Sequence, residues 1–185
     1  GVAENDIATA SVFTTMSATA VLEKIRDQIH AATPAATDFL LGPGGTRTVF
    51  AVDALSSITF NRQTTVSGPP SPVQVSLSMI RAVPGAVGTV AFGKYLSPDY
   101  QVHPGQYIPP VGTRTGSPVV QSMNEIYFNL FLPSGPEPAD GWPVALSQHG
   151  GPGNKQADQL LANIATMAQH GIATIVINGV GRGFG

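Results

Sequence analysis

Two short apolar runs near the end of the sequence restrict the fold more than any other feature. The runs occupy residues 144–148 and 172–178, and their apolar residues are continuous rather than alternating with polar ones. Continuous runs of this length are typical of parallel strands that are buried on both faces of a sheet. Parallel neighbours need a crossover, which the intervening residues supply as one helix. The sequence therefore predicts a β-α-β unit and an α/β fold.

The expected crossover helix has recognisable ends. Asn154 is the expected N-cap, and Asp158 places a negative charge in the first turn, where it suits the helix dipole. Gly171 suits the left-handed residue just past the last turn. The predicted apolar face consists of Leu160, Leu161, Ile164, Met167 and Ala168.

A glycine-rich turn at residues 149–153 follows the first of these strands. Open α/β sheets bind ligands at the carboxyl ends of their strands. Glycines let the backbone approach a developing negative oxygen closely, whereas Pro152 has no N–H to donate. The turn is therefore the predicted functional site. The other histidines, His30, His103 and His170, have no partners at a suggestive spacing.

The region from about residue 124 to residue 185 resembles the first strands of α/β-hydrolase enzymes, in particular secreted bacterial serine esterases and lipases that carry a β-rich N-terminal region. The resemblance lies in His149-Gly150-Gly151-Pro152-Gly153, in Gly181-Arg182-Gly183-Phe184-Gly185 and in the strand at residues 125–133. In that family the first motif follows strand three and supplies an oxyanion-hole amide, and the second follows strand four. The resemblance implies that Gly151 donates the N–H, that Gly150 shapes the loop, and that His149 supports the loop rather than acting as the base.

The hydrolase nucleophile motif, Gly-x-Ser-x-Gly, does not occur in these 185 residues. The resemblance implies that the Ser, an Asp or Glu and the catalytic His lie on a separate C-terminal chain. We therefore expect the N-terminal portion of a carboxylic-ester hydrolase, inactive alone and acting on a small ester when completed. Strand three lies beside strand five in that family, so its edge is expected to be open and apolar.

Three alternatives remain from the residues alone. His-Gly-Gly-Pro-Gly is also the form seen in proline iminopeptidases, although the strand at residues 125–133 favours an ester substrate. The second alternative is a non-catalytic module that binds a ligand or partner. A phosphate loop is the third alternative, but Lys155 does not directly follow a glycine and Gln156 replaces the required hydroxyl residue.

Residues 1–118 are predicted to form a separate β-rich region, followed by the incomplete hydrolase part at residues 119–185. One packing helix is expected at residues 17–31, with Ser17 as its N-cap and with Leu22, Ile25 and Ile29 on its apolar face. Strands are expected at residues 46–53, 57–61 and 72–83, and a strand at residues 87–92 is expected to pair with the last of these across the Pro84-Gly85 turn.

A linker rich in proline and glycine is predicted at residues 94–118. Its aromatic residues, Tyr95, Tyr100 and Tyr107, are candidates for the apolar walls of a substrate cleft. Long irregular loops are often functional, which is the reason for this hypothesis.

Composition excludes several classes of function. Charged residues make up only 11% of the sequence and the net charge is −2, so the basic footprint of a nucleic-acid binder is missing. Cysteine is absent, which excludes thiol catalysis and zinc–thiolate sites. No cofactor or metal is expected. We expect a secreted or periplasmic protein whose signal peptide is not part of this sequence, and we expect no transmembrane segment.

Overall fold

The computed structural model describes residues 3–9, 11, 17–62, 67–112, 115–150 and 153–179. The chain forms two compact units. The smaller unit combines Gly1–Pro34 with Pro98–Met123, and the larger combines Ala35–Ser97 with Asn124–Gly185. Residues from both sides of the predicted boundary at 118 thus belong to the same unit.

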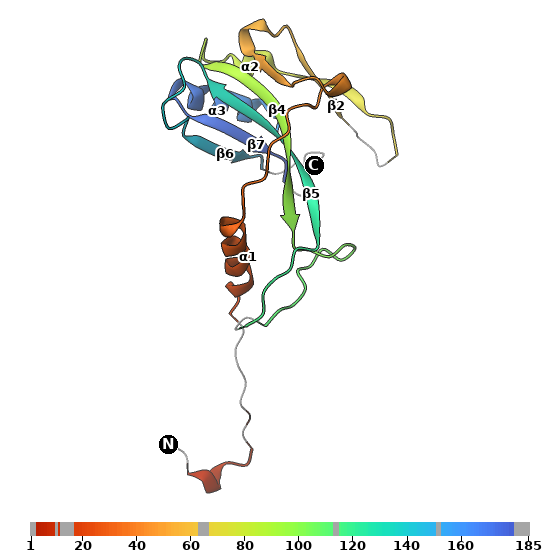
Figure 1. Cartoon of the computed structure of the whole chain (residues 1–185), viewed down its shortest axis with the longest axis vertical. Coiled ribbons are helices and arrows are strands. Elements are labelled where there is room, and N and C mark those ends of the chain that lie inside the picture. The colour runs from red at the N-terminus through yellow and green to blue at the C-terminus, as the bar shows by residue number, and fades with distance from the viewer. Residues whose placement is uncertain are drawn as a thin grey trace. The chain divides into compact units, whose positions relative to one another are not determined.

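The larger unit contains a mixed sheet with the strand order β1-β4-β5-β7-β6 (Figure 1). Its strands are β1 (Val49–Ala51), β4 (Val87–Asp99), β5 (Ser122–Pro133), β6 (Val144–Gln148) and β7 (Ala173–Ile177). Strand β1 is antiparallel to β4, β5 is antiparallel to β7, and β6 is parallel to β7. This mixed sheet, together with the helices, confirms the predicted α/β class, whereas the assignment to the α/β-hydrolase fold stays a prediction. The run at residues 87–92 belongs to β4 and lies between β1 and β5. The expected pairing of this run with residues 72–83 was therefore wrong.

The predicted β-α-β unit is present, with helix α3 (Asp158–Gln169) connecting β6 to β7. The expected N-cap was wrong: the helix is preceded by Ala157, while the Asn154 side chain accepts a hydrogen bond from the Gln156 N–H at 2.8 Å. Asn154 thus closes a local turn before the helix, a common alternative use of an asparagine side chain. Gly171 follows the helix with φ = 73°, as predicted.

The hydrophobic core lies between α3 and one face of the sheet. Leu161 and Ile164 of the helix and Phe131 and Val176 of the sheet are each at most 1% exposed. Met167, which we placed on the packing face, is 41% exposed. Ala165 is buried instead, so the buried face of α3 is rotated from the predicted one.

A second layer of short elements completes this core. Strands β2 (Ile58–Arg62) and β3 (Ser71–Val75) form an antiparallel pair, and a short helix α2 (Leu77–Ile80) follows β3. The prediction of one strand over residues 72–83 was therefore wrong. Leu77 and Ile80 are three residues apart, a spacing that also suits a helix, and Ile80 is only 1% exposed. Burial of Ile80 in the core is consistent with the helical alternative.

The crossover strands differ in burial, although their sequences are similarly apolar. Strand β7 lies inside the sheet, and Ala173, Thr174 and Val176 are buried. Strand β6 is the last strand in the order, and Val144 and Leu146 are 63% and 68% exposed. The expectation that both strands are buried on both faces was therefore wrong for β6, because it has a neighbour on one side only among the described residues.

The smaller unit is organised around helix α1 (Ala20–Ala31). The helix begins after Thr19 rather than Ser17, and no side chain caps it. The Lys24 Nζ donates hydrogen bonds to the carbonyls of Gly112 and Gly116, and the Gln28 side chain donates one to Pro118 O at 3.0 Å. Polar side chains therefore tie α1 to the loop, and no residue of the helix is fully buried.

Gly93 in β4 permits an aromatic cluster and generates a stability prediction. A Cβ atom added to Gly93 would lie 2.5 Å from Phe128 Cζ and 2.9 Å from Phe39 Cε1. The Phe39 and Phe128 rings meet edge to face with their centroids 5.7 Å apart. We expect Gly93→Ala to lower the free energy of unfolding in urea by about 1–3 kcal/mol, because the rings must separate.

Gly150→Ala is the matched control, since a Cβ atom there would meet nothing within 4 Å. We expect it to change the free energy of unfolding by less than about 1 kcal/mol. Equal effects of the two substitutions would contradict the proposed role of Gly93.

Candidate functional site

The candidate site lies where β6 and β7 end side by side. Gln148 is in register with Ile177, so the turn that follows β6 and the residues that follow β7 leave the same edge of the sheet. His149 and Gly150 begin the first of these segments, and Asn178 and Gly179 begin the second. The parallel pairing therefore brings the predicted turn together with a second loop.

The His149 ring joins the two segments. Its Nε2 accepts a hydrogen bond from the Gly179 N–H at 3.3 Å, and its Nδ1 lies 3.4 Å from Gly150 O. An Nε2 that accepts and an Nδ1 that donates define the neutral ring with its proton on Nδ1. Both ring nitrogens are thus engaged with the backbone of the loops.

Close backbone packing shapes the turn itself. The Gly153 N–H donates to Gly150 O at 3.0 Å. A Cβ atom on Gly153 would lie 3.0 Å from that same oxygen and 3.2 Å from the His149 Cβ, so this position favours glycine. Gly151, the predicted N–H donor, and Pro152 lie outside the described residues, as do residues 180–185 of the second motif.

Lys155 extends the site to a third strand. Its backbone N–H donates to Asn178 Oδ1 at 2.8 Å, and its Nζ donates to Tyr127 O in β5 at 2.9 Å. The strand order places β7 between β6 and β5, so this side chain connects the loop after β6 to a strand on the far side of β7. Burial lowers the pKa of the Lys155 ammonium from its ordinary value to about 8.

Sequence reasoning missed this role of Lys155. The residue was considered only as part of a poor phosphate loop, and its partner in β5 is distant in sequence. The available signal is the scarcity of lysines, because the sequence has only three.

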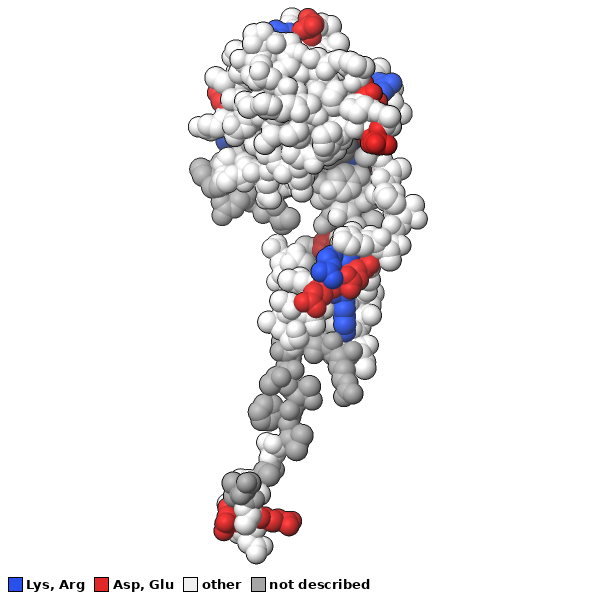
Figure 2. Space-filling model, turned by 90° about the vertical axis from the view of Figure 1, so that its left-hand side faces the viewer, with Lys and Arg blue, Asp and Glu red and all other residues white. Residues whose placement is uncertain are grey.

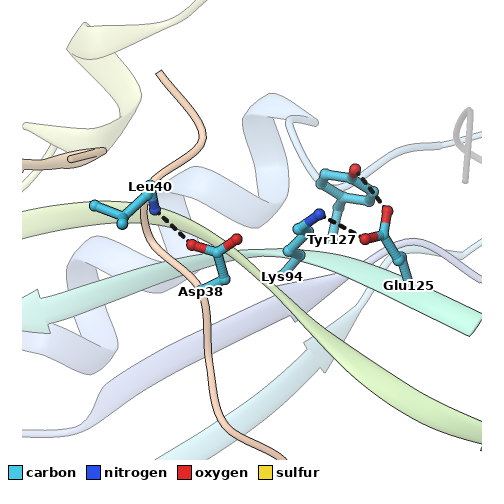
Figure 3. A network of polar contacts seen from close by, with 5 residues as sticks. All are labelled: Asp38, Leu40, Lys94, Glu125 and Tyr127. Carbon is cyan, nitrogen blue, oxygen red and sulfur yellow. Dashed lines mark hydrogen bonds and ion pairs between the residues drawn. The ribbon is translucent and has the colours of Figure 1, made fainter. Parts of the chain in front are cut away.

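A polar network surrounds Tyr127 on β4 and β5 (Figure 3). The Lys94 ammonium contacts Glu125 Oε1 at 2.5 Å, and the Tyr127 hydroxyl donates to Glu125 Oε2 at 3.0 Å. The hydrogen bond from Lys94 lowers the pKa of Glu125 and the same bond raises the pKa of Lys94. Asp38 lies in the same view and accepts from the Leu40 N–H at 2.8 Å. The Lys94 and Glu125 side chains are 26% and 46% exposed, so solvent screens the ion pair and the network adds little stability.

The three predicted cleft tyrosines have different environments. Tyr95 belongs to the larger unit, and its ring centroid lies 6.0 Å from that of Phe128. Tyr100 and Tyr107 belong to the smaller unit, where Tyr100 is 7% exposed and donates to Gln28 Oε1, while Tyr107 is 56% exposed. The structure does not bring the three together within one unit, and the substrate cleft stays a prediction.

His103 has a partner that the sequence did not indicate. Its Nε2 lies 2.7 Å from Asp99 Oδ2, and Asp99, which is 8% exposed, also accepts from the Gln101 N–H at 2.8 Å. Asp99 is the last residue of β4, and His103 lies four residues later in the loop that follows. Loop residues have no regular periodicity, so the sequence did not predict this contact. The pair stabilises the loop of the smaller unit.

Charge and metal chemistry give no alternative site among the described residues. The face drawn in Figure 2 carries few charged side chains, and both signs are present on it. No group of three or more His, Cys, Asp or Glu in the described ranges could hold a metal ion. No helix within those ranges is long and apolar enough to cross a membrane.

Comparisons with family models, with curated proteins and with solved structures find no match to this chain. The geometry of the loops and of the sheet therefore carries the functional proposal.

The His149 bridge generates a prediction for backbone dynamics. In His149→Ala the Gly179 N–H loses its acceptor, and a hydrogen bond contributes about 0.5–1.5 kcal/mol net. We expect the Gly179 amide to exchange with deuterium about two- to tenfold faster, measured by nuclear magnetic resonance. His170→Ala, at the C-terminal end of α3, is the control and should leave this rate unchanged. An unaltered Gly179 rate in His149→Ala would show that the bridge is not formed in solution.

Proposed function

We propose that this chain is the N-terminal portion of a serine carboxylic-ester hydrolase. In this proposal residues 149–153 supply the oxyanion-hole loop, and the Ser, Asp or Glu, and His of the triad belong to polypeptide outside these residues. One observation carries the proposal: β6, which corresponds to strand three in the resemblance, lies at the end of the sheet beside β7, with its other edge open among the described residues. That is the edge at which the family places strand five.

Acyl transfer explains why a tied glycine-rich turn would be useful. The reaction develops a negative oxygen, which preorganised N–H groups stabilise. His149 holds the turn to the loop after β7, and Gly153 closes it through its hydrogen bond to Gly150 O. Because both nitrogens of His149 are engaged with backbone groups, the geometry favours a supporting role for this residue over proton transfer. Gly151 is the proposed donor.

The open edge of β6 is suited to a further strand. Pro143 O accepts a hydrogen bond from the Ala173 N–H at 2.9 Å. In a parallel pair this means that the backbone N–H and C=O groups of the odd-numbered residues in β6 point toward β7. The backbone groups of Val144, Leu146 and Gln148 then point toward the open edge. An edge strand with apolar side chains, paired on one side only among the described residues, is a template for pairing with another segment.

The surface next to this edge is also apolar and recessed. A groove of about 270 Å³ lies between β6 and α3 and is lined in part by Leu146, Ile164 and Met167. Leu146 and Met167 are 68% and 41% exposed. A strand and helix from the completing polypeptide would cover both the edge and the groove. Such an interface resembles a domain core divided in two and is expected to exceed roughly 2,000 Å².

The experiment that tests this proposal is turnover of p-nitrophenyl butyrate. The purified chain should give no sustained turnover that a serine-directed phosphonate abolishes, because it has no nucleophile motif. Adding the polypeptide that carries Gly-x-Ser-x-Gly should create that turnover. Phosphonate-sensitive turnover by the chain alone would contradict the proposal.

Gly151→Val tests the assigned donor in the completed enzyme. A branched side chain should redirect the N–H away from the oxyanion, and loss of one such donor lowers kcat about 10²–10³-fold. Phosphonate labelling of the Ser and the circular dichroism spectrum serve as controls for assembly and folding. An unchanged kcat in the folded complex would show that the donor lies elsewhere.

A further inference from the structure

The groove between β6 and α3 has an uncharged lining. The apolar part of this lining includes Ala145 of β6 and Ile164 and Met167 of α3, and Thr174 of β7 belongs to its polar part. No charged side chain is among the described residues that line the groove. Its volume is about 270 Å³, which equals the space of about nine water molecules at roughly 30 Å³ each. The groove therefore has room for a small molecule and no charged group to pair with an ionic one.

Thr174 is a buried polar residue in this lining and lacks a partner. It is 2% exposed, and its Oγ1 has no hydrogen-bond partner within the described part of the chain. Thr174 is two residues from Val176, which packs with Ile164 in the core, so its side chain lies on the face of β7 that α3 covers. A buried hydroxyl without a partner is uncommon in native structures, and a bound molecule is one explanation for it.

The Thr174 hydroxyl has a simple route to the groove. Its Oγ1 is covered, although the residue itself is part of the lining. A threonine carries a hydroxyl and a methyl group on Cβ, and a turn of about 120° about χ1 places the hydroxyl at another staggered position. We expect such a turn to present the hydroxyl to a bound molecule. Ala145 is the register partner of Thr174 in β6, so its small side chain lies on the same face and leaves space there.

The lining places two demands on an occupant. A charged group would lose its hydration without an opposite charge nearby. Water would satisfy the Thr174 hydroxyl but would leave the Met167 side chain, which is 41% exposed, hydrated. An uncharged molecule with an apolar body and one hydroxyl group meets both demands, because it shields Met167 and completes the hydrogen bond of Thr174.

We propose that this groove binds a short aliphatic alcohol, whose hydroxyl pairs with Thr174 Oγ1 and whose carbon chain lies against Ala145 and Met167. Binding makes and breaks no covalent bond. The inference does not depend on the proposed ester hydrolase, because it uses neither the loops after β6 and β7 nor the missing triad. The completing polypeptide of that proposal would cover the groove, so alcohol binding belongs to the chain on its own.

The test titrates the whole purified chain with 1-hexanol and follows carbon-13-labelled methionine methyl groups by nuclear magnetic resonance. We expect a saturable shift of the Met167 methyl signal with a dissociation constant on the order of 1–10 mM, as suits a ligand of about seven non-hydrogen atoms in an open groove. Met123, which is 52% exposed in the smaller unit, is the internal control and should show no saturable shift. Hexanoate and hexylammonium, the charged analogues, should bind at least about tenfold more weakly.

Two variants of Thr174 separate the hydroxyl from the shape of the side chain. Thr174→Val keeps the shape and should weaken 1-hexanol about two- to tenfold, the loss expected for one hydrogen bond. It should leave the free chain at least as resistant to urea, because it removes a hydroxyl that has no partner. Thr174→Ser keeps the hydroxyl and should retain most of the affinity.

Three results would each overturn the proposal. The first is the lack of a saturable Met167 shift with 1-hexanol in the wild-type chain. The second is binding of hexanoate as tight as that of 1-hexanol. The third is unchanged affinity for 1-hexanol in folded Thr174→Val, which would leave apolar contact as the sole source of binding.

Discussion

The packing of α3 on β7 is the interaction on which the rest of the larger unit depends. Leu161 and Ile164 of the helix are buried in the same core as Val176 of the strand, and each such side chain contributes about 1.5–3 kcal/mol by leaving water. This burial holds β6 and β7 as parallel neighbours joined by one helix. Because their register aligns Gln148 with Ile177, the two following loops begin together. The His149 bridge and the contacts of Lys155 are consequences of that alignment.

Local signals were sufficient to predict this β-α-β unit. Two continuous apolar runs gave both strands, and Gly171 gave the left-handed end of the helix, because each depends on residues close in sequence. The stretch at residues 72–83 was misassigned, since Val75, Leu77 and Met79 fit a strand while Leu77 and Ile80 also fit a helix. Only packing against the core chooses between these periodicities. The position of β4 beside β5 likewise depends on contacts between distant residues.

The candidate site was predictable only where it depends on residues that are close in sequence. The turn after residue 148 was identified from its glycines and from its place after a strand. The contact between His149 and Gly179 spans 30 residues, and that between Lys155 and Tyr127 spans 28, so neither follows from spacing. Lys155 also acquires its low pKa from burial, which depends on tertiary structure. The site therefore combines a locally encoded turn with a lysine whose character arises from the fold.

The proposed ester hydrolysis places one demand on the open end of the sheet. Ester hydrolysis requires a further strand on β6, because the nucleophile must come from outside the described residues. The central claim thus concerns the open edge of β6, where Val144 and Leu146 are mostly exposed.

Residue-resolved deuterium exchange along β6 tests that claim most directly. In the chain alone, the Ala145 and Ser147 amides should be protected by β7, while the Val144, Leu146 and Gln148 amides should exchange rapidly. Addition of the polypeptide that carries the nucleophile motif should protect the second set without altering the first. Continued rapid exchange at Leu146 in the active complex would contradict the account, because β6 would then not be an interior strand of the completed sheet.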